Sequence, residues 1–380
     1  MNMRFLGAIS LFLCSAEFSS AVDYTTIQNS NVTVTGIRSD SVTMGTDSVV
    51  ITAIYNTGTS NVAALYNGPL SGAVEPSAVW NQLNPILSGQ TVTSSSFYGP
   101  NTAIFNPSLG AGNVIAVGSY TYAESTAGAN SAHGLLYQGT VTGSGTWVQI
   151  DATPLVLSGS LANTIAHSNM GDLVVGNYDT TETPGNAFIY NRIANTWTNL
   201  NPASSTSITA YGIWQNGGSS STSYTIAGGF SDLNSGGLDQ GYLLNYDSST
   251  GDITNYKTYN YDDLPITSLV SHFDGITATE EGFNLTGFYS TVDPLVDAGF
   301  FASVTVNLDG SFSEAAWTNI AVPGAAVTTG NTIIGNSVLG FYDDGSSHSF
   351  IATVPEPNAL TLLPLAAGFL LLSGRSRQKA

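Results

Sequence analysis

The stretch LVVGNYDT (residues 173–180) is one of six related segments that recur along the chain. Each has an apolar pair, a small residue, a variable residue and then Tyr or Phe. Successive small residues are 65, 58, 52, 59 and 53 positions apart, a period typical of one repeated supersecondary unit. The segments are VITAIYNT (50–57), IAVGSYTY (115–122), LVVGNYDT (173–180), TIAGGFSD (225–232), NLTGFYST (284–291) and SVLGFYDD (337–344), with the small residue at Ala53, Gly118, Gly176, Gly228, Gly287 and Gly340.

Each unit contains enough β-rich segments for four strands. A segment such as NAFIYN (186–191) follows the repeated one, and a more variable segment such as NTIAHSN (163–169) precedes it. Most units end with an aromatic residue and an aliphatic residue three positions later. These pairs are Trp80/Leu83, Trp147/Ile150, Trp197/Leu200 and Trp317/Ile320, and DITNYKTYN (252–260) takes their place in the fourth unit. Gly, Asn, Asp and Ser between the segments predict turns.

Four strands repeated at this period predict an all-β fold, a β-propeller of six four-stranded blades. We expect the small residue to permit close backbone approach between inner strands of neighbouring blades. The aromatic residue two positions later lies on the same face of its strand and is expected to fill the space between blades.

The sixth unit lacks its last strand, because the repeat ends at HSFIAT (348–353). The segment DYTTIQN (23–29) carries Tyr24 and Ile27 at the spacing of Trp80 and Leu83. We therefore predict that residues 23–30 pair with the sixth blade as its outer strand and cover an edge that would otherwise be open.

The composition argues against a nucleic-acid partner. The chain has 7 Lys and Arg against 26 Asp and Glu, and residues 22–353 contain three basic residues, Arg38, Arg192 and Lys257, for a formal charge of −21. Such a surface repels phosphate backbones, whose binding relies on Lys and Arg.

The four histidines do not predict a shared catalytic or metal site. His133 and His348 occupy the same place in their repeats, so a ring of blades separates them. His167 and His272 lie in the variable strands of the third and fifth units, where we expect polar residues near the axis or in a turn. Without a Gly-x-Ser-x-Gly sequence, nothing indicates a hydrolytic triad.

The carboxylates are equally uninformative about catalysis. Adjacent acidic pairs occur at Asp262-Asp263, Glu280-Glu281 and Asp343-Asp344, and each is expected in a solvated turn. The segment DLNSGGLDQG (232–241) begins like a calcium loop but has Gly236 at the fifth ligand position. We predict no catalytic residue, no metal site and no cofactor.

The amino terminus predicts export. One basic residue, an apolar run over 5–13 and small residues at Ser19 and Ala21 indicate a signal peptide over 1–21, cleaved before Val22. Lipidation of Cys14, the chain's single cysteine, is disfavoured because Leu13 is large. The mature chain would then contain no disulfide.

The carboxyl terminus combines three features in a fixed order. Pro355, Glu356 and Pro357 precede an apolar run over 359–372, and a basic cluster of Arg375, Arg377 and Lys379 follows. As a helix the 14-residue run is about 21 Å long, shorter than the ~30 Å hydrocarbon core of a bilayer. The basic cluster would remain cytoplasmic.

This arrangement resembles the PEP-CTERM sorting signal, and the glycine-aromatic units resemble HAF-type extracellular repeats of bacterial surface proteins. The first resemblance implies recognition by an exosortase-type processing enzyme, a membrane-held precursor, and delivery to the surface or extracellular matrix of a Gram-negative bacterium. A plain membrane anchor is the alternative for this tail.

The sequence predicts three parts: a signal peptide (1–21), a propeller (22–353) and a sorting segment (354–380). The leading hypothesis is a non-enzymatic surface or matrix protein that binds extracellular polysaccharide or other surface proteins through Tyr- and Asn-rich loops. The alternative is a secreted glycan hydrolase that uses loop carboxylates, which would need two carboxyl groups within roughly 5–10 Å of each other.

Overall fold

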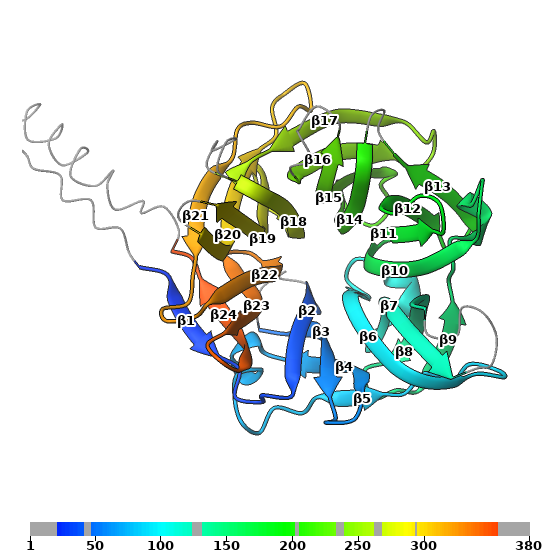
Figure 1. The fold of residues 1–380 in the computed structure, drawn as a ribbon, viewed down its shortest axis with the longest axis horizontal. Coiled ribbons are helices and arrows are strands. Elements are labelled where there is room, and N and C mark those ends of the chain that lie inside the picture. Colours follow the sequence, from blue (N-terminus) through cyan, green and yellow to red (C-terminus); the bar gives the residue numbers. More distant parts are fainter. Residues whose placement is uncertain are drawn as a thin grey trace, which may run out of the picture. The chain divides into compact units, whose positions relative to one another are not determined.

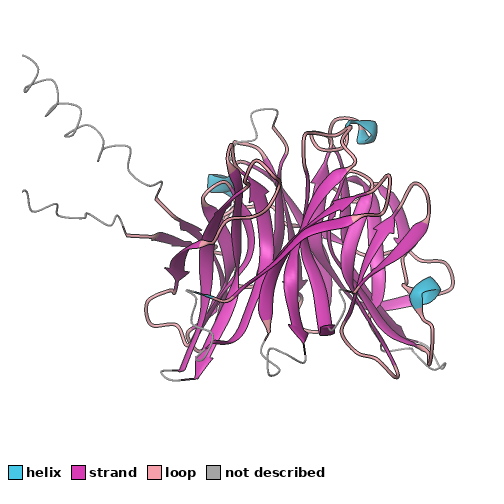
Figure 2. Ribbon diagram, turned by 90° about the horizontal axis from the view of Figure 1, so that it is seen from above, coloured by secondary structure: helices cyan, strands magenta, loops and turns pink. Residues whose placement is uncertain are grey.

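The protein is described by a computed structural model covering residues 21–41, 47–123, 131–201, 205–232, 239–261, 268–292 and 295–355. These residues form six four-stranded antiparallel sheets arranged as blades around a central axis, which confirms the predicted six-bladed β-propeller (Figure 1). Figure 2 shows the sheets side-on, with strands running along the axis and turns at both ends. The predicted signal peptide and carboxyl-terminal helix lie outside the described residues.

The first three blades follow one another along the chain, each running from an innermost to an outermost strand. They are blade 1, β2 (Val32–Ser39), β3 (Val49–Asn56), β4 (Asn61–Gly68) and β5 (Asn81–Leu83); blade 2, β6 (Thr91–Thr102), β7 (Asn113–Ala123), β8 (His133–Thr140) and β9 (Gly145–Gln149); and blade 3, β10 (Leu161–Met170), β11 (Leu173–Thr180), β12 (Asn186–Asn191) and β13 (Thr196–Leu200).

The remaining blades repeat this order, except that the sixth borrows its outer strand from the amino terminus. They are blade 4, β14 (Ser205–Gln215), β15 (Ser223–Asp232), β16 (Gln240–Asp247) and β17 (Ile253–Tyr259); blade 5, β18 (Ser268–Ala278), β19 (Gly282–Val292), β20 (Leu295–Thr305) and β21 (Ala316–Ile320); and blade 6, β22 (Val327–Ile334), β23 (Ser337–Asp343), β24 (Ser347–Thr353) and β1 (Asp23–Thr26). Short 3₁₀ helices occur at η1 (Leu70–Gly72), η2 (Pro107–Leu109) and η3 (Thr153–Leu155).

The ring closes as predicted. Strand β1 pairs with β24 in an antiparallel ladder that sets Tyr24 opposite Ala352. Ile27 is 1% exposed, and its amide donates a hydrogen bond to the Ser349 carbonyl at 2.8 Å. The amino-terminal strand therefore supplies both a ladder and a buried aliphatic side chain to the last blade (Figure 1).

The aromatic residue of the repeat fills the space between blades, as expected. Five of the six, Tyr120, Tyr178, Phe230, Tyr289 and Tyr342, are buried. Tyr178 of blade 3, for example, shares a hydrophobic cluster with Leu136 of blade 2 and Ile150, which directly follows β9. The core therefore lies between adjacent sheets.

The predicted reason for the repeated glycine is wrong, because the close approach occurs within one blade. A Cβ added at Gly287 on β19 would lie 1.8 Å from the carbonyl oxygen of His272 on β18. At Gly176 it would lie 2.1 Å from the Ile165 carbonyl oxygen. The glycine therefore makes room for the innermost strand of its own sheet.

Close approach between blades occurs instead on the innermost strands. A Cβ added at Gly36 of blade 1 would lie 2.1 Å from the Tyr98 carbonyl oxygen of blade 2. One added at Gly99 would lie 2.7 Å from the His167 carbonyl oxygen of blade 3. Each of these glycines directly follows an irregularity in its strand, and this irregularity forms the candidate site.

Candidate functional site on the propeller axis

Every innermost strand carries a β-bulge near its middle. The pairing register shifts between Val34 and Gly36 on β2 and between Ala166 and Ser168 on β10, so the residue between them has no partner in the ladder. A bulge of this kind adds one residue and re-aims its side chain. The six bulged residues are Thr35, Tyr98, His167, Tyr211, Asp274 and Asn331.

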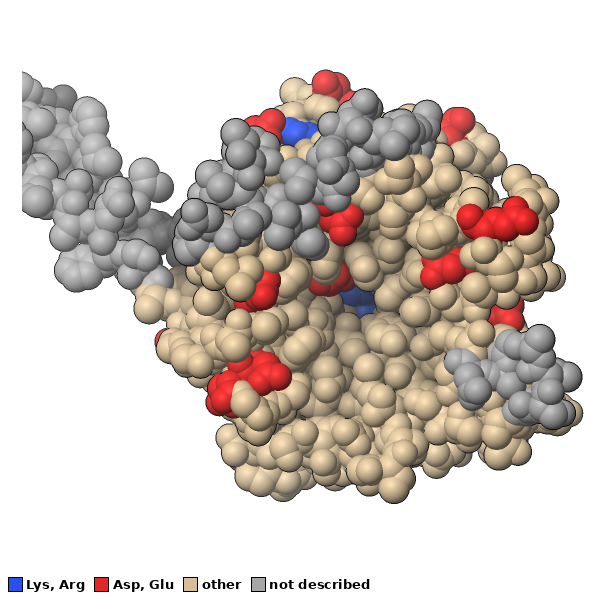
Figure 3. Space-filling model, in the orientation of Figure 1, with Lys and Arg blue, Asp and Glu red and all other residues tan. Residues whose placement is uncertain are grey.

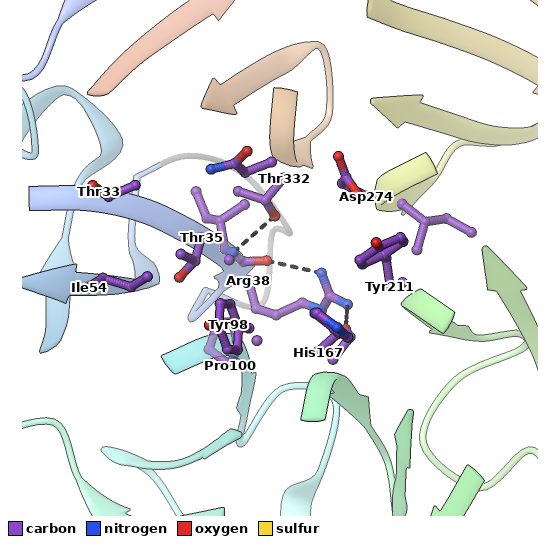
Figure 4. Close-up of a pocket in the computed structure, with 18 of the residues that line it drawn as sticks. Thr33, Thr35, Arg38, Ile54, Tyr98, Pro100, His167, Tyr211, Asp274 and Thr332 are labelled. Atoms are coloured by element: carbon purple, nitrogen blue, oxygen red, sulfur yellow. Dashed lines mark hydrogen bonds between the residues drawn. The ribbon is translucent and has the colours of Figure 1, made fainter. Parts of the chain in front are cut away.

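The bulged residues form a ring of polar side chains around the axis. Each is partly exposed, whereas the residues directly before and after it are buried. All six line one cavity of about 300 Å³ on the axis (Figure 4). The fold therefore brings one polar side chain from each blade to a common space.

Aromatic and imidazole rings form a continuous arc on one side of this cavity. The ring centroids of Tyr98 and His167 are 5.4 Å apart, those of His167 and Tyr211 are 4.7 Å apart, and those of Tyr211 and His272 are 5.3 Å apart. His167 Nε2 lies 2.8 Å from Asn177 Oδ1 on β11. This contact fixes the imidazole at the wall.

The two axial histidines have opposite pKa shifts. Burial lowers the pKa of His167 to about 4, so its imidazole is neutral near pH 7. Burial also lowers the pKa of His272, but the Asp274 carboxylate, 2.9 Å away, and a smaller contribution from Asp239 raise it above its usual value. Burial raises the pKa of Asp274 against the opposing effect of His272.

Arg38 forms the bottom of the cavity. Its side chain leaves β2 and crosses toward blades 3 and 4, as Figure 4 shows. Nη2 donates to Ser168 Oγ at 3.4 Å and to the Ile213 carbonyl at 3.0 Å, and Nη1 donates to the Ile37 carbonyl at 3.0 Å. The guanidinium carbon lies 5.6 Å from the ring centroid of Trp214.

The hollow is visible in Figure 3, with Lys or Arg atoms at its bottom and Asp or Glu atoms beside them. Among its lining residues, Arg38 is the cation and Asp274 is the carboxylate. Burial lowers the pKa of Arg38 to about 10, so the guanidinium is still charged at neutral pH.

Two of the predicted histidine positions lie near the axis and two lie elsewhere. His167 and His272 line the axial cavity, as expected of polar residues in the variable strands. His133 of blade 2 contacts Asp151, with Nδ1 2.8 Å from Oδ2. His348 of blade 6 has Nε2 3.5 Å from Asp344 Oδ1, so each of these two histidines has its own aspartate partner.

The acidic pairs do not converge on the axial cavity. Glu280 and Glu281 are exposed and line a separate groove of about 750 Å³ with Asn216 and Asn245. Asp343 lies at the end of β23, where its Oδ1 accepts a hydrogen bond from the Gly345 amide at 2.8 Å. Asp262-Asp263 and most of the 232–241 segment lie outside the described residues.

Sequence reasoning missed most of the ring. Thr35, Tyr98, Tyr211, Asp274 and Asn331 were not predicted, and Arg38 entered only as a term in the net charge. The available signal is a polar residue followed by Gly, Ser or Thr in each variable strand: TG at 35–36, YG at 98–99, HS at 167–168, YG at 211–212, DG at 274–275 and NT at 331–332.

Comparisons with known proteins extend the fold assignment no further. No protein-family profile and no curated protein matches the chain. A Trypanosoma rangeli sialidase in complex with the inhibitor DANA aligns with a TM-score of 0.44 and 9% identity over 88% of this chain and 55% of that one. The S. cerevisiae core factor aligns with a TM-score of 0.32 and 8% identity over 94% and 64%. The chain thus spans less than two thirds of each structure.

The part of the chain that the structure describes contains no helix with the length and apolar character needed to span a bilayer. Within the same residues, no group of three or more His, Cys, Asp or Glu side chains is arranged to hold a metal ion.

Proposed function

We propose that this protein is an exported, non-enzymatic binding protein of the bacterial surface or extracellular matrix, and that the propeller axis is its ligand site. The observation that carries the proposal is the ring of six bulged polar residues around one cavity. Concave sites with a few convergent polar groups are where small molecules bind most often. The bulge recurs in every blade, but the side chain that it aims at the cavity differs from blade to blade, as Tyr98, Asp274 and Asn331 illustrate.

The binding role is favoured over the glycan hydrolase because of the carboxylates. Hydrolysis of a glycosidic bond ordinarily uses two carboxyl groups on either side of the bond. Among its described lining residues the axial cavity has one, Asp274, and that group is paired with His272. The exposed Glu280 and Glu281 lie in a different groove.

Filling the cavity tests the location of the site. Tyr98→Trp adds volume at the cavity wall, and we expect it to abolish binding to a panel of immobilised extracellular sugars that the wild-type chain binds. Tyr256→Trp on the outer strand β17 is the matched control, because Tyr256 lies on the exposed surface. Equal loss of binding in both variants, or unchanged binding in Tyr98→Trp, would contradict an axial site.

The proposed delivery route rests on the tail. Pro355, Glu356 and Pro357, the apolar run over 359–372 and the basic cluster of Arg375, Arg377 and Lys379 match the order of a PEP-CTERM signal. In this proposal an exosortase-type enzyme processes a membrane-held precursor. Changing the three motif residues to Ala should leave an unprocessed precursor in the membrane fraction, with Asn358→Ala as control. Normal processing of the triple variant would overturn the route.

A further inference from the structure

The three basic residues of the described propeller differ in whether they have a carboxylate partner. Arg192 Nη2 lies 2.9 Å from Asp172 Oδ1, and Lys257 Nζ lies 2.7 Å from Glu314 Oε1. Arg38, the third basic residue of this region, has no carboxylate of the described residues within ion-pair distance. Of the Lys and Arg residues that the structure describes, the one without a carboxylate partner therefore lies at the bottom of the axial cavity.

The Arg38 guanidinium also lacks a full set of hydrogen-bond acceptors. The residue is 6% exposed, and its three hydrogen-bond acceptors are all uncharged: two carbonyls and the Ser168 hydroxyl. Nε is buried and has no hydrogen-bond partner among the described residues. A desolvated cation without an anion is costly to a fold, and an anion that enters the cavity would offset that cost.

The electrostatics of the cavity favour a ligand with one negative charge. Asp274, which also lines the cavity, repels anions, and its negative charge is offset when His272 is protonated. A monoanion directed at Arg38 is then attracted without a large repulsion from Asp274. A dianion such as a phosphate monoester ordinarily requires more than one cation, and the described lining residues include no second Lys or Arg.

The walls favour a polyhydroxylated ring attached to that charge. Tyr98 and Tyr211 offer aromatic surface, and Ile54, Ile276 and Phe341 add apolar surface. The lining also includes side chains that can form hydrogen bonds, from Thr33, Thr35, Ser168, Asn331 and Thr332. A lining that combines apolar and hydrogen-bonding groups suits a sugar, whose ring faces are apolar and whose edges are hydroxyls.

The bottom of the cavity restricts how such a ligand enters. Arg38 spans the axis from blade 1 to blades 3 and 4, and Trp214 and Phe105 pack behind it with ring centroids 5.5 Å apart. A continuous polymer therefore cannot thread past these side chains. The volume of about 300 Å³ is at the small end of ligand sites, which fits one sugar unit.

We propose that the axial cavity binds a single hexuronic acid unit with its carboxylate on Arg38 and its ring against the aromatic arc of Tyr98, His167 and Tyr211. This inference rests on the proposed function, since it assumes that the axis is the ligand site. The unit is either a free hexuronate or the terminal residue of an acidic polysaccharide, because both present the same carboxylate and ring.

The test is calorimetric titration of the full mature chain with D-glucuronate, its neutral methyl ester and D-glucose. We expect glucuronate to bind about tenfold or more tightly than the ester, since hydrogen bonds to charged groups are among the strongest. Equal affinity for acid and ester in the wild-type chain would overturn the inference. Adding a glucuronate-terminated oligosaccharide distinguishes the sources: tighter binding of the oligosaccharide favours a polymer end, and tighter binding of the monomer favours the free sugar.

Variants assign the effect to the guanidinium. Arg38→Gln should reduce glucuronate affinity about tenfold or more, and Arg38→Lys, which keeps the charge, should retain part of it. Arg192→Gln, at an arginine that is paired with Asp172 and does not line the cavity, should leave glucuronate affinity unchanged. If Arg38→Gln fails to fold, the acid-to-ester ratio in Arg38→Lys replaces it, and a ratio of one there would overturn the inference. If neutral glucose binds tightly and Tyr98→Trp removes that binding, the axial site is supported but the specificity for a carboxylate is overturned. If no sugar binds, both the hexuronate inference and the proposed axial site are overturned.

Discussion

The second strand of each blade and the innermost strand beside it follow opposite rules. The second strands, such as β11 and β19, repeat their glycine and aromatic residue with little change, and these residues are tightly packed. The innermost strands vary in sequence, yet each has a bulge at an equivalent place. The residues that repeat on the second strands are therefore those that the fold requires. The bulged residues occupy an equivalent place in each blade but vary in type, so they are where the blades differ in chemistry.

The two strands depend on each other physically. The bulge on β18 brings the His272 carbonyl against β19, and only a residue without a side chain fits opposite it at Gly287. In five of the six blades a glycine is therefore the counterpart of the bulge, and Ala53 takes that place in blade 1. If this comparison holds, substitutions in the repeated elements should lower stability, and substitutions in the ring should change binding with little effect on stability.

The largest expected effect comes from removing the closing strand. Deleting Asp23–Gln28 from the chain would expose the edge of β24 and remove Ile27 from the core. We expect the free energy of unfolding to fall by more than the ~2–5 kcal/mol that loss of one buried aliphatic side chain causes. Thermal unfolding followed by circular dichroism measures this, with Asp23→Asn at an exposed position as control. Unchanged melting would mean that β1 does not close the ring.

The next effect concerns the glycine opposite the bulge. Gly287→Val places carbon atoms against the His272 carbonyl, and we expect the free energy of unfolding to fall by roughly 2–4 kcal/mol because neither strand can move away. Chemical denaturation provides the value. Ala53→Gly at the equivalent position of blade 1 is the matched control and should cost about 1 kcal/mol or less. Similar losses in the two variants would refute the packing explanation.

Two neighbouring residues on β6, Phe97 and Tyr98, differ in burial and in expected role. Phe97 is fully buried, and Phe97→Ala should destabilise the fold by about 3–5 kcal/mol. Tyr98 is the partly exposed bulge residue, so Tyr98→Ala should cost about 1 kcal/mol or less while it abolishes sugar binding. Chemical denaturation of the Phe97→Ala and Tyr98→Ala variants measures the change in stability, and calorimetric titration of the same variants measures sugar binding. A large stability loss in Tyr98→Ala would assign the ring a structural role instead.

The smallest effect is the pH dependence of stability. The raised pKa of His272 stabilises the folded state below pH 6.5, and this contribution is lost as pH rises through the folded-state pKa. The lowered pKa of His167 acts in the opposite sense, with a contribution present above pH 6.5 and lost as pH falls toward about 4. Asp274 faces both Tyr211 and His272, and its own raised pKa also favours folding at lower pH.

Proton NMR of the imidazoles measures these shifts directly. His272 should titrate above pH 6.5, and His167 should remain neutral down to about pH 4. In Asp274→Asn the raising effect is removed, so burial should bring the pKa of His272 below its usual value. Two axial histidines that titrate together at pH 6.5 would be incompatible with the described cavity.

Most of the architecture was predictable because packing between blades imposes a repeat. The Tyr24 and Ile27 spacing even indicated the closing strand, since an outer strand needs the same aromatic and aliphatic contacts wherever it lies in the chain. The site was less accessible. The loop between the first two strands varies in length, so Thr35 lies 18 residues before Ala53 whereas His167 lies 9 before Gly176. That variation hides the alignment of the ring.

Arg38 shows a second reason why the site could not be predicted from the sequence. Its guanidinium contacts residues from three blades, and no spacing in the sequence indicates that Ile37, Ser168 and Ile213 lie together. The expected role of the repeated glycine was wrong for a related reason, because the bulge that crowds it is a feature of strand pairing.

The most direct test of an axial site uses the four histidines as reporters. Two of them, His167 and His272, line the cavity, and His133 and His348 lie on other strands of blades 2 and 6. The imidazole signals of the full chain would be followed while D-glucuronate, or D-glucose, is added. We expect saturable shifts of the His167 and His272 signals, with those of His133 and His348 unchanged. Shifts confined to His133 or His348, or no shift with either sugar, would contradict it.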